Sequence, residues 1–199
     1  MNQQRRELLA AAGAAGLSPF VPAWADQLSA PDRKVLSNFG SGYILPGSGW
    51  RGFSDRVMGG ISNADLDTAR IEGRNCIRLT GNVTRESNGG FIQMAMYFGR
   101  NYDELDGSQY KGIEMLVYGN NEDYNLHVRT SDCNWYDQSY RATFYAEPTW
   151  SRIRIPWESM RANRVRTKLN AGRLQRIAIL GWMREFDADV ALAEIALYS

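Results

Sequence analysis

One short stretch places polar side chains that could bind a ligand on a single face of a strand. Side chains of a strand alternate between its two faces, so polar groups at every second residue of Tyr124–Thr130 should point the same way: Asn125, His127 and Arg129. Trp135 and Tyr136 follow shortly after, and polar groups beside aromatic rings suit a carbohydrate, a peptide or another polar ligand. The alternative is that this face is merely the solvated side of the strand.

The single histidine has no catalytic context in the sequence. A Gly-x-Ser-x-Gly elbow is absent, and Cys133 shortly after His127 lacks the surroundings of a nucleophile. No His-Glu-x-x-His motif or metal-spaced cysteine pair occurs. We therefore predict a non-enzymatic protein with no metal and no cofactor. A carboxylate pair for glycoside cleavage stays an alternative, with these candidates: Glu86, Asp103, Glu114 and Asp137.

The elements that must position these residues are short apolar runs separated by Gly, Asn and Asp. They are enriched in β-branched and aromatic residues, which favours strands, and no helical pattern of useful length separates them. An antiparallel β-sandwich is expected, with strands at Cys76–Val83, Gly90–Tyr97, Ile113–Tyr118, Tyr124–Thr130, Arg141–Ala146, Ser151–Trp157, Arg176–Trp182 and Val190–Tyr198.

Residues 1–25 have the order of an export signal. Arg5 and Arg6 precede a mildly apolar stretch rich in Ala and Gly, and Ala23-Trp24-Ala25 provides a small-x-small cleavage site. We predict a twin-arginine signal peptide and a periplasmic protein, with an uncleaved N-terminal anchor as the alternative. Residues 26–37 are then an N-terminal segment, and residues 38–199 a single domain.

The composition of the chain after this signal restricts the partners. It carries equal numbers of acidic and basic residues, which gives no reason to expect nucleic acid, and no further stretch is apolar enough to span a membrane. Cys76 and Cys133 could form a disulfide after export. Because Cys76 lies in an apolar run and Cys133 in a polar loop, their pairing stays open.

The run Ser54–Ala64, Ser-Asp-Arg-Val-Met-Gly-Gly-Ile-Ser-Asn-Ala, describes a shaped loop and neither a regular helix nor an alternating strand. Its adjacent glycines permit positive φ angles and close backbone approach, and its short polar side chains can bind turn backbone. We expect Asp55 and Arg56 to form a structural ion pair. The loop is interpreted as architectural, through Asp55, Arg56, Met58, Gly59, Gly60 and Asn63.

This run resembles the Ser-Asp-Arg-x-Met-Gly-Gly-x-Ser signature of the thirty-kilodalton complex I intermediate-associated protein family. The resemblance extends from Asn38 to the C-terminus, and further similar points include Leu79-Thr80-Gly81-Asn82-Val83 and Ile195-Ala196-Leu197-Tyr198. It implies a jelly-roll β-sandwich of the galactose-binding-domain type. It also implies an assembly factor or chaperone that binds protein intermediates of the membrane arm of respiratory complex I. The alternative function is a periplasmic carbohydrate-binding protein.

Overall fold

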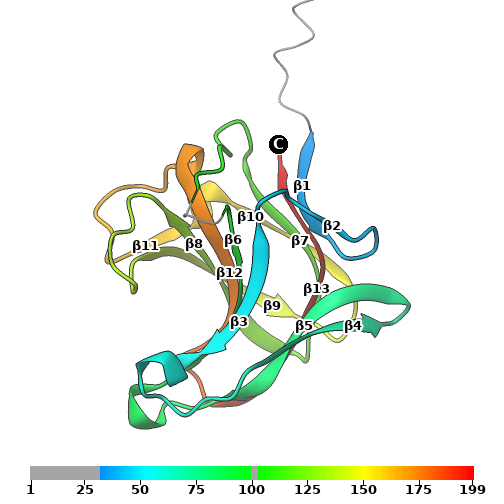
Figure 1. The fold of residues 1–199 in the computed structure, drawn as a ribbon, viewed down its shortest axis with the longest axis vertical. Coiled ribbons are helices and arrows are strands. Elements are labelled where there is room, and N and C mark those ends of the chain that lie inside the picture. The colour runs from blue at the N-terminus through cyan, green and yellow to red at the C-terminus, as the bar shows by residue number, and fades with distance from the viewer. Residues whose placement is uncertain (1–31, 100–102) are drawn as a thin grey trace, which may run out of the picture.

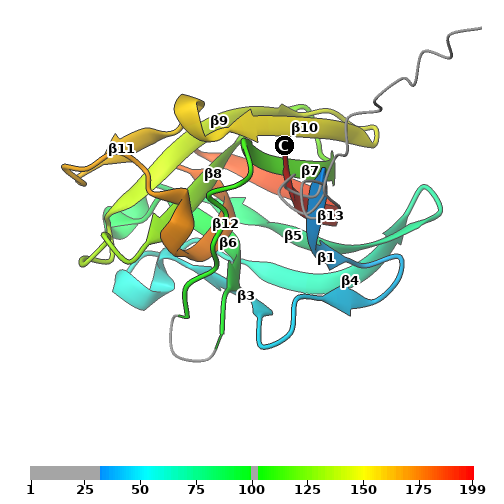
Figure 2. The same cartoon turned by 90° about the horizontal axis from the view of Figure 1, so that it is seen from above.

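The computed structural model describes residues 32–99 and 103–199, so the predicted signal peptide lies outside the described residues. Two antiparallel sheets lie face to face, and the polypeptide passes repeatedly from one to the other (Figures 1 and 2). The expected antiparallel β-sandwich is confirmed. Four short 3-10 turns connect strands in the described part: η2 (Asp55–Met58), η3 (Glu86–Asn88), η4 (Trp157–Ser159) and η5 (Ala171–Arg173).

The first sheet, sheet A, is organised around its long last strand, β13 (Phe186–Tyr198). On one side β13 pairs with β7 (Gly112–Tyr118), and β10 (Ser151–Pro156) lies beyond β7. On its other side the first half of β13 pairs with β5 and the second half with β1. The remaining bounds are β1 (Arg33–Asn38), β2 (Tyr43–Ile44), β4 (Asp65–Ile71) and β5 (Arg74–Val83).

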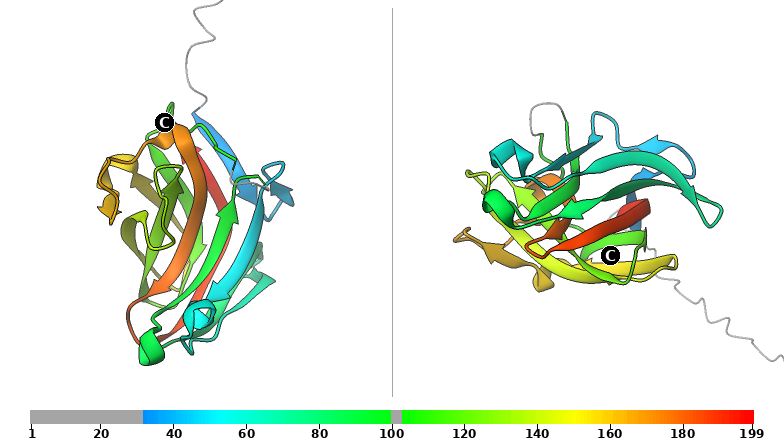
Figure 3. Two further views of the ribbon diagram at one scale, coloured as in Figure 1. Left: turned by 60° about the vertical axis from the view of Figure 1, so that its left-hand side comes forward. Right: turned by 90° about the horizontal axis from the view of Figure 1, so that it is seen from below.

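The second sheet, sheet B, has the order β11-β9-β8-β12-β6-β3. In Figure 3, left, β12 in orange is followed by β6 in green and β3 in cyan. Strands far apart in the sequence are therefore neighbours, which matters for the site described below. The bounds are β3 (Gly49–Ser54), β6 (Phe91–Tyr97), β8 (Glu122–Thr130), β9 (Ser139–Ala146), β11 (Arg161–Asn163) and β12 (Leu174–Trp182).

The core lies between the two sheets and follows from the alternation of the strands. Every second residue of β8 is fully buried, namely Tyr124, Leu126 and Val128, as its pattern predicted. Sheet A contributes the matching apolar residues from β7 and β13 to the same core cluster, among them Met115, Val117 and Leu192. Burial of these side chains from both sheets holds the sandwich together.

All eight predicted strands are present, and the described part of the chain holds five more that were not predicted. β1 pairs with β13 from Arg33 onward, so the domain begins inside the segment 26–37 that was expected to precede it. The glycine-rich run Asn38–Trp50 includes β2 and the start of β3. Gly52 of β3 is needed because an added Cβ would lie 2.6 Å from the Leu66 side chain. Among the described residues, no helix has the length and apolar character to cross a membrane.

Candidate functional site

The outward face of sheet B is unusual because its middle strands bury residues on that side too. Ala95 of β6 and Ala178 of β12 are fully buried there, together with Leu180. Small alanines at adjacent outward positions leave room for larger neighbours, and Phe53, Phe91, Tyr97 and Trp182 pack against this cluster. The outward face of sheet B is therefore partly covered by packed side chains and is not simply exposed to solvent.

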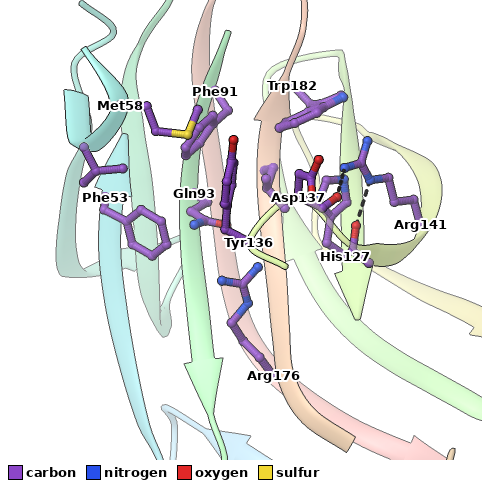
Figure 4. A pocket seen from close by; sticks show the side chains of 13 residues that line it. Phe53, Met58, Phe91, Gln93, His127, Tyr136, Asp137, Arg141, Arg176 and Trp182 are labelled. Carbon is purple, nitrogen blue, oxygen red and sulfur yellow. Dashed lines mark hydrogen bonds between the residues drawn. The ribbon is translucent and has the colours of Figure 1, made fainter. Parts of the chain in front are cut away.

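A cleft of about 570 Å³ opens over this face, and we call it the sheet B cleft (Figure 4). Its apolar side comes from β3, η2 and the ends of β6 and β12: Phe53, Val57, Met58, Phe91, Leu180 and Trp182. Its polar side comes mainly from β8, β9, β12 and the loop 131–138: His127, Tyr136, Asp137, Ser139, Arg141 and Arg176, with Gln93 from β6. Strands β3, β6, β12, β8 and β9 are consecutive in sheet B, so sheet order brings these side chains together.

A chain of aromatic rings runs along the apolar side. The ring centroids of Phe53 and Phe91 are 6.3 Å apart at 87°, and those of Phe91 and Trp182 are 5.9 Å apart at 33°. Arg141 places its guanidinium carbon 4.6 Å from the centre of the Trp182 ring. Such pairs fix the orientation of each ring, so this side of the cleft is a preformed apolar surface.

His127 lies at the floor of the cleft and is only 3% exposed. Its ring centroid is 5.1 Å from that of Trp182, and its Nε2 atom has no hydrogen-bond partner among the described residues. Burial lowers the pKa of His127 to about 2, aided by the positive charges of Arg141 and Arg176. The imidazole is therefore neutral at physiological pH, and a buried polar atom without a partner is the kind of group that a ligand can satisfy.

Two arginines border the cleft in defined orientations. Arg141 donates from Nε to Ser139 Oγ at 2.8 Å and from Nη2 to the Asp137 carbonyl at 3.2 Å, and burial lowers its pKa. Arg176 donates from Nη1 to the Tyr97 hydroxyl at 3.4 Å, while its buried Nε has no hydrogen-bond partner within the described part of the chain. The carboxylate of Asp137 pairs with Arg164.

Arg129 does not enter the cleft but holds the loop that contributes to it. Its Nη1 donates to the carbonyl oxygens of Trp135 at 2.7 Å, Tyr136 at 3.1 Å and Gln138 at 2.8 Å. Its Nη2 donates to the carbonyl of Cys133 at 2.9 Å. One guanidinium thus binds main-chain oxygens along most of loop 131–138, and it sets the position of Tyr136 and Asp137.

The five predicted binding residues separate into different places. His127 and Tyr136 line the cleft, whereas Asn125 lines a neighbouring hollow and contacts Thr143. Trp135 is 68% exposed and is not part of the cleft lining. Asn125, His127 and Arg129 do point to the same side, but only one of them reaches the cavity.

Sequence reasoning missed most of the cleft, including Phe53, Phe91, Arg141, Arg176 and Trp182. One signal was available, because Gln93 interrupts an apolar strand that is otherwise buried on both faces. A polar residue at such a position indicates a covered, polar cavity on the outward face. The cross-strand neighbours of Gln93, Phe53 on one side and Leu180 on the other, are set by the register of sheet B.

The signature loop acts on the cleft through Asp55, which is fully buried. Its carboxylate accepts hydrogen bonds from the amides of Ser62 at 2.9 Å, Gly90 at 2.6 Å and Phe91 at 3.1 Å, and from the Ser62 hydroxyl at 2.5 Å. Burial alone would raise the pKa of Asp55, but these hydrogen bonds lower it. Asp55 thereby fixes the start of β6, which carries Phe91 into the cleft.

The predicted ion pair between Asp55 and Arg56 is wrong. Arg56 turns away and donates to the carbonyl of Ser62 at 3.2 Å and to the side chain of Asn63. The glycines fit their expected purpose, since Gly59 has φ +91° and an added Cβ on Gly60 would lie 2.3 Å from the Asp55 carboxylate. Met58, expected to be structural, is 51% exposed and lines the cleft instead.

The other titratable groups considered in the sequence lie elsewhere. Cys76 and Cys133 are both free, each buried in a different apolar cluster, so no disulfide links them. Of the four carboxylates considered as acid–base candidates, Asp137 alone lines the cleft. No group of three His, Cys, Asp or Glu side chains in residues 32–99 and 103–199 is placed to hold a metal ion.

Glu114 lies on the outer face of sheet A, opposite the cleft. Its carboxylate accepts from Arg33 and Arg154 at 2.7 Å each and from Arg152 at 2.6 Å. Burial alone would raise the pKa of Glu114, but the three arginines outweigh it and lower the pKa to about 2. The group is a structural ion cluster that joins β1, β7 and β10.

Comparison with known proteins gives a family and a fold. The family model for complex I intermediate-associated protein 30 (CIA30) matches residues 39–188. No curated protein matches the sequence.

Similar solved structures include carbohydrate-binding modules. A family 11 module from Clostridium thermocellum, in complex with a β-1,3-1,4-mixed-linked tetrasaccharide, is 14% identical with a TM-score of 0.66, covering 86% of this chain and 98% of that chain. The family 11 module of a Clostridium thermocellum cellulosomal cellulase is 13% identical with a TM-score of 0.64, and the match covers 86% of this chain and 96% of that chain. A family 30 module is 16% identical with a TM-score of 0.58, and the match covers 84% of this chain and 87% of that chain. At these identities the likeness shows the fold, a galactose-binding-like β-sandwich.

Proposed function

The chain belongs to the complex I intermediate-associated protein 30 family, and we propose that it is a non-enzymatic binding protein whose ligand is a glycan held in the sheet B cleft. The observation that carries this proposal is the combination of a preformed aromatic side with a floor that includes the Nε2 of His127, which has no hydrogen-bond partner among residues 32–99 and 103–199. Aromatic faces pack against sugar rings, while buried polar atoms bind hydroxyl groups. A similar fold is known in complex with a tetrasaccharide, which supports this ligand class.

The carboxylates argue for binding rather than cleavage. Glycosidases ordinarily use two carboxyl groups that flank the scissile bond. Asp137 is the one carboxylate in the lining of this cleft, and it is paired with Arg164. We therefore assign no catalytic role to the described residues of the cleft.

A protein partner is the second candidate, and the exposed apolar side chains of the signature loop favour it. Val57 is 70% exposed, and Met58 and Ile61 on the same signature loop are also exposed. Exposed apolar side chains gathered on one loop are typical of a contact surface. With the family description, this loop supports an assembly factor or chaperone that binds a protein partner at the rim of the cleft, where Val57 and Met58 also line the cavity.

We also propose that the protein is exported to the periplasm by a twin-arginine signal in residues 1–25. Replacement of Arg5 and Arg6 by Lys should leave the full-length precursor in the cytoplasm. Cell fractionation with an antibody against the folded domain measures this. Periplasmic protein at wild-type levels in that variant would contradict the signal.

Tyr136 offers the sharpest test of the glycan proposal, because Trp135 beside it is a matched control. Tyr136 lines the cleft, whereas Trp135 lies outside it, and both side chains are largely exposed, so neither truncation should unfold the protein. In a glycan panel followed by calorimetry, Tyr136→Ala should weaken the best ligand about tenfold. Trp135→Ala should bind as the wild type does.

Two results would decide against the glycan. If no saccharide binds, or if Trp135→Ala and Tyr136→Ala weaken binding equally, the cleft is not the glycan site. Capture of one membrane-complex subunit by the wild type from solubilised membranes would instead support the protein-partner function if it is lost in Ile61→Ser, a change on the signature loop outside the cleft lining, but kept in Tyr136→Ala.

A further inference from the structure

The sheet B cleft is positively charged where it would meet the polar groups of a ligand. Arg141 and Arg176 both line it, and neither forms an ion pair with a carboxylate in the described part of the chain. Asp137, the acidic residue of the lining, is paired with Arg164 outside the lining. Arg141 lies over the Trp182 ring and Arg176 over the Tyr97 ring, and Asp137 attracts Arg141 only from beyond ion-pair distance. Charged groups partly removed from water are usually paired, so the cleft has the charge to accept an anion.

The hydrogen-bonding capacity left on these arginines points the same way. Arg176 has a buried Nε that donates to no described group. Its Nη1 donates to the Tyr97 hydroxyl at 3.4 Å, and its guanidinium carbon lies 5.7 Å from the centre of the Tyr97 ring. Arg141 uses Nε and Nη2 to bind Ser139 and the Asp137 carbonyl, which leaves Nη1 without a hydrogen-bond partner among the described residues. Each guanidinium is thus oriented by the protein and retains N–H groups for another molecule.

His127 shows that both cations act on the same point of the cleft. The charges of Arg141 and Arg176 both lower its pKa, and Figure 4 shows the three side chains around the polar side of the cavity. The imidazole is neutral, so the positive charge at this point comes from the two arginines. An anion placed beside His127 would be attracted by both guanidinium groups.

We propose that the sheet B cleft selects an acidic saccharide, a sugar that bears a carboxylate, with Arg176 and Arg141 as the groups that bind the carboxylate. This inference rests on the proposed glycan function and names its ligand class. A carboxylate matches the planar guanidinium with two parallel hydrogen bonds. The aromatic side of the cleft and Tyr136 would contact the apolar face of the sugar ring.

The test uses two probes with the same saccharide backbone, trigalacturonic acid with its free carboxylates and its uncharged methyl ester. Calorimetry on the mature protein at pH 7 should show the free acid binding at least about tenfold more tightly than the ester. Higher salt should weaken the acid more than the ester. Arg176→Gln should reduce the preference for the acid by at least about tenfold, and the same change at Arg70, exposed on β4 of sheet A, is the matched control.

Each outcome has a definite meaning. Equal binding of acid and ester overturns the acidic ligand and leaves the glycan function standing. If neither probe binds and no neutral glycan in the panel binds, the acidic ligand and the glycan function are both overturned. If Arg176→Gln fails to fold by thermal denaturation, Arg141→Gln and the comparison of the two probes on the wild type decide the question. A preference that persists in both arginine variants would also overturn the assignment.

Discussion

The buried histidine makes the stability of this protein depend on pH in a predictable way. His127 has its pKa lowered from 6.5 to about 2 by burial and by two neighbouring arginines. In the unfolded chain the imidazole takes up a proton as the pH falls below 6.5, while the folded protein does not follow until near pH 2. The unfolded state then binds more protons, so stability decreases on acidification. Between pH 8 and pH 5 the loss amounts to about 2 kcal/mol.

The window from pH 8 to pH 5 isolates this effect because the chain has a single histidine. The carboxylates with lowered pKa values, such as Glu114, contribute stability that is present above pH 4.5 and is lost as the pH falls toward about 2. They change little in the upper window. Urea denaturation at pH 8, 7, 6 and 5 should therefore report mainly on His127.

The variant His127→Gln removes the titrating group and should abolish most of the decrease. Asn125→Gln, a change on the same strand outside the cleft, is the control and should retain the wild-type decrease. A wild-type free energy of unfolding that stays constant from pH 8 to pH 5 would refute the reasoning. An unchanged decrease in His127→Gln would do the same, since it would assign the titration to another group.

Three further substitutions test the frame of the cleft. Asp55→Asn puts donors against main-chain N–H groups and should lower the free energy of unfolding by about 2–4 kcal/mol in urea; an effect below 1 kcal/mol would show that these bonds are dispensable. Gly60→Ala forces a Cβ against that carboxylate and should cost about 2 kcal/mol, whereas Gly49→Ala, which meets no atom within 4 Å, should be nearly neutral in the same assay. Arg129→Ala should make loop 131–138 more sensitive to limited proteolysis and should weaken ligand binding in calorimetry. If neither effect is seen, the loop keeps its conformation without Arg129 and the prediction is wrong.

Local patterns predicted the strands well where alternation was clear. β8 is an example, since Tyr124, Leu126 and Val128 enter the core as expected. Prediction failed for β3, because Gly49 and Gly52 give it the composition of a loop. Gly52 is required by the close approach of Leu66 from β4, a contact between neighbouring segments that composition does not reveal.

The cleft could be predicted only in part because it is assembled by sheet order. Phe53 and Arg176 line the same cavity although they lie far apart in the sequence, since β6 separates β3 from β12 in sheet B. No local pattern specifies that order. Trp135 and Tyr136 illustrate a finer limit, because adjacent aromatic residues of similar character are separated by how Arg129 fixes the loop backbone.

Asp55, a residue of the family signature, fixes the start of β6, whereas other residues line the cleft. This residue that identifies the family is therefore not one of the residues that would bind the ligand. The carboxylate reaches the amides of Gly90 and Phe91, yet Asp55 does not line the cleft. Side chains such as Arg141 and Arg176 could be exchanged during evolution without disturbing that anchor. Relatives recognised by the same signature would then share a scaffold while differing in ligand, and each would have to be assigned from the outward residues of its own β9 and β12.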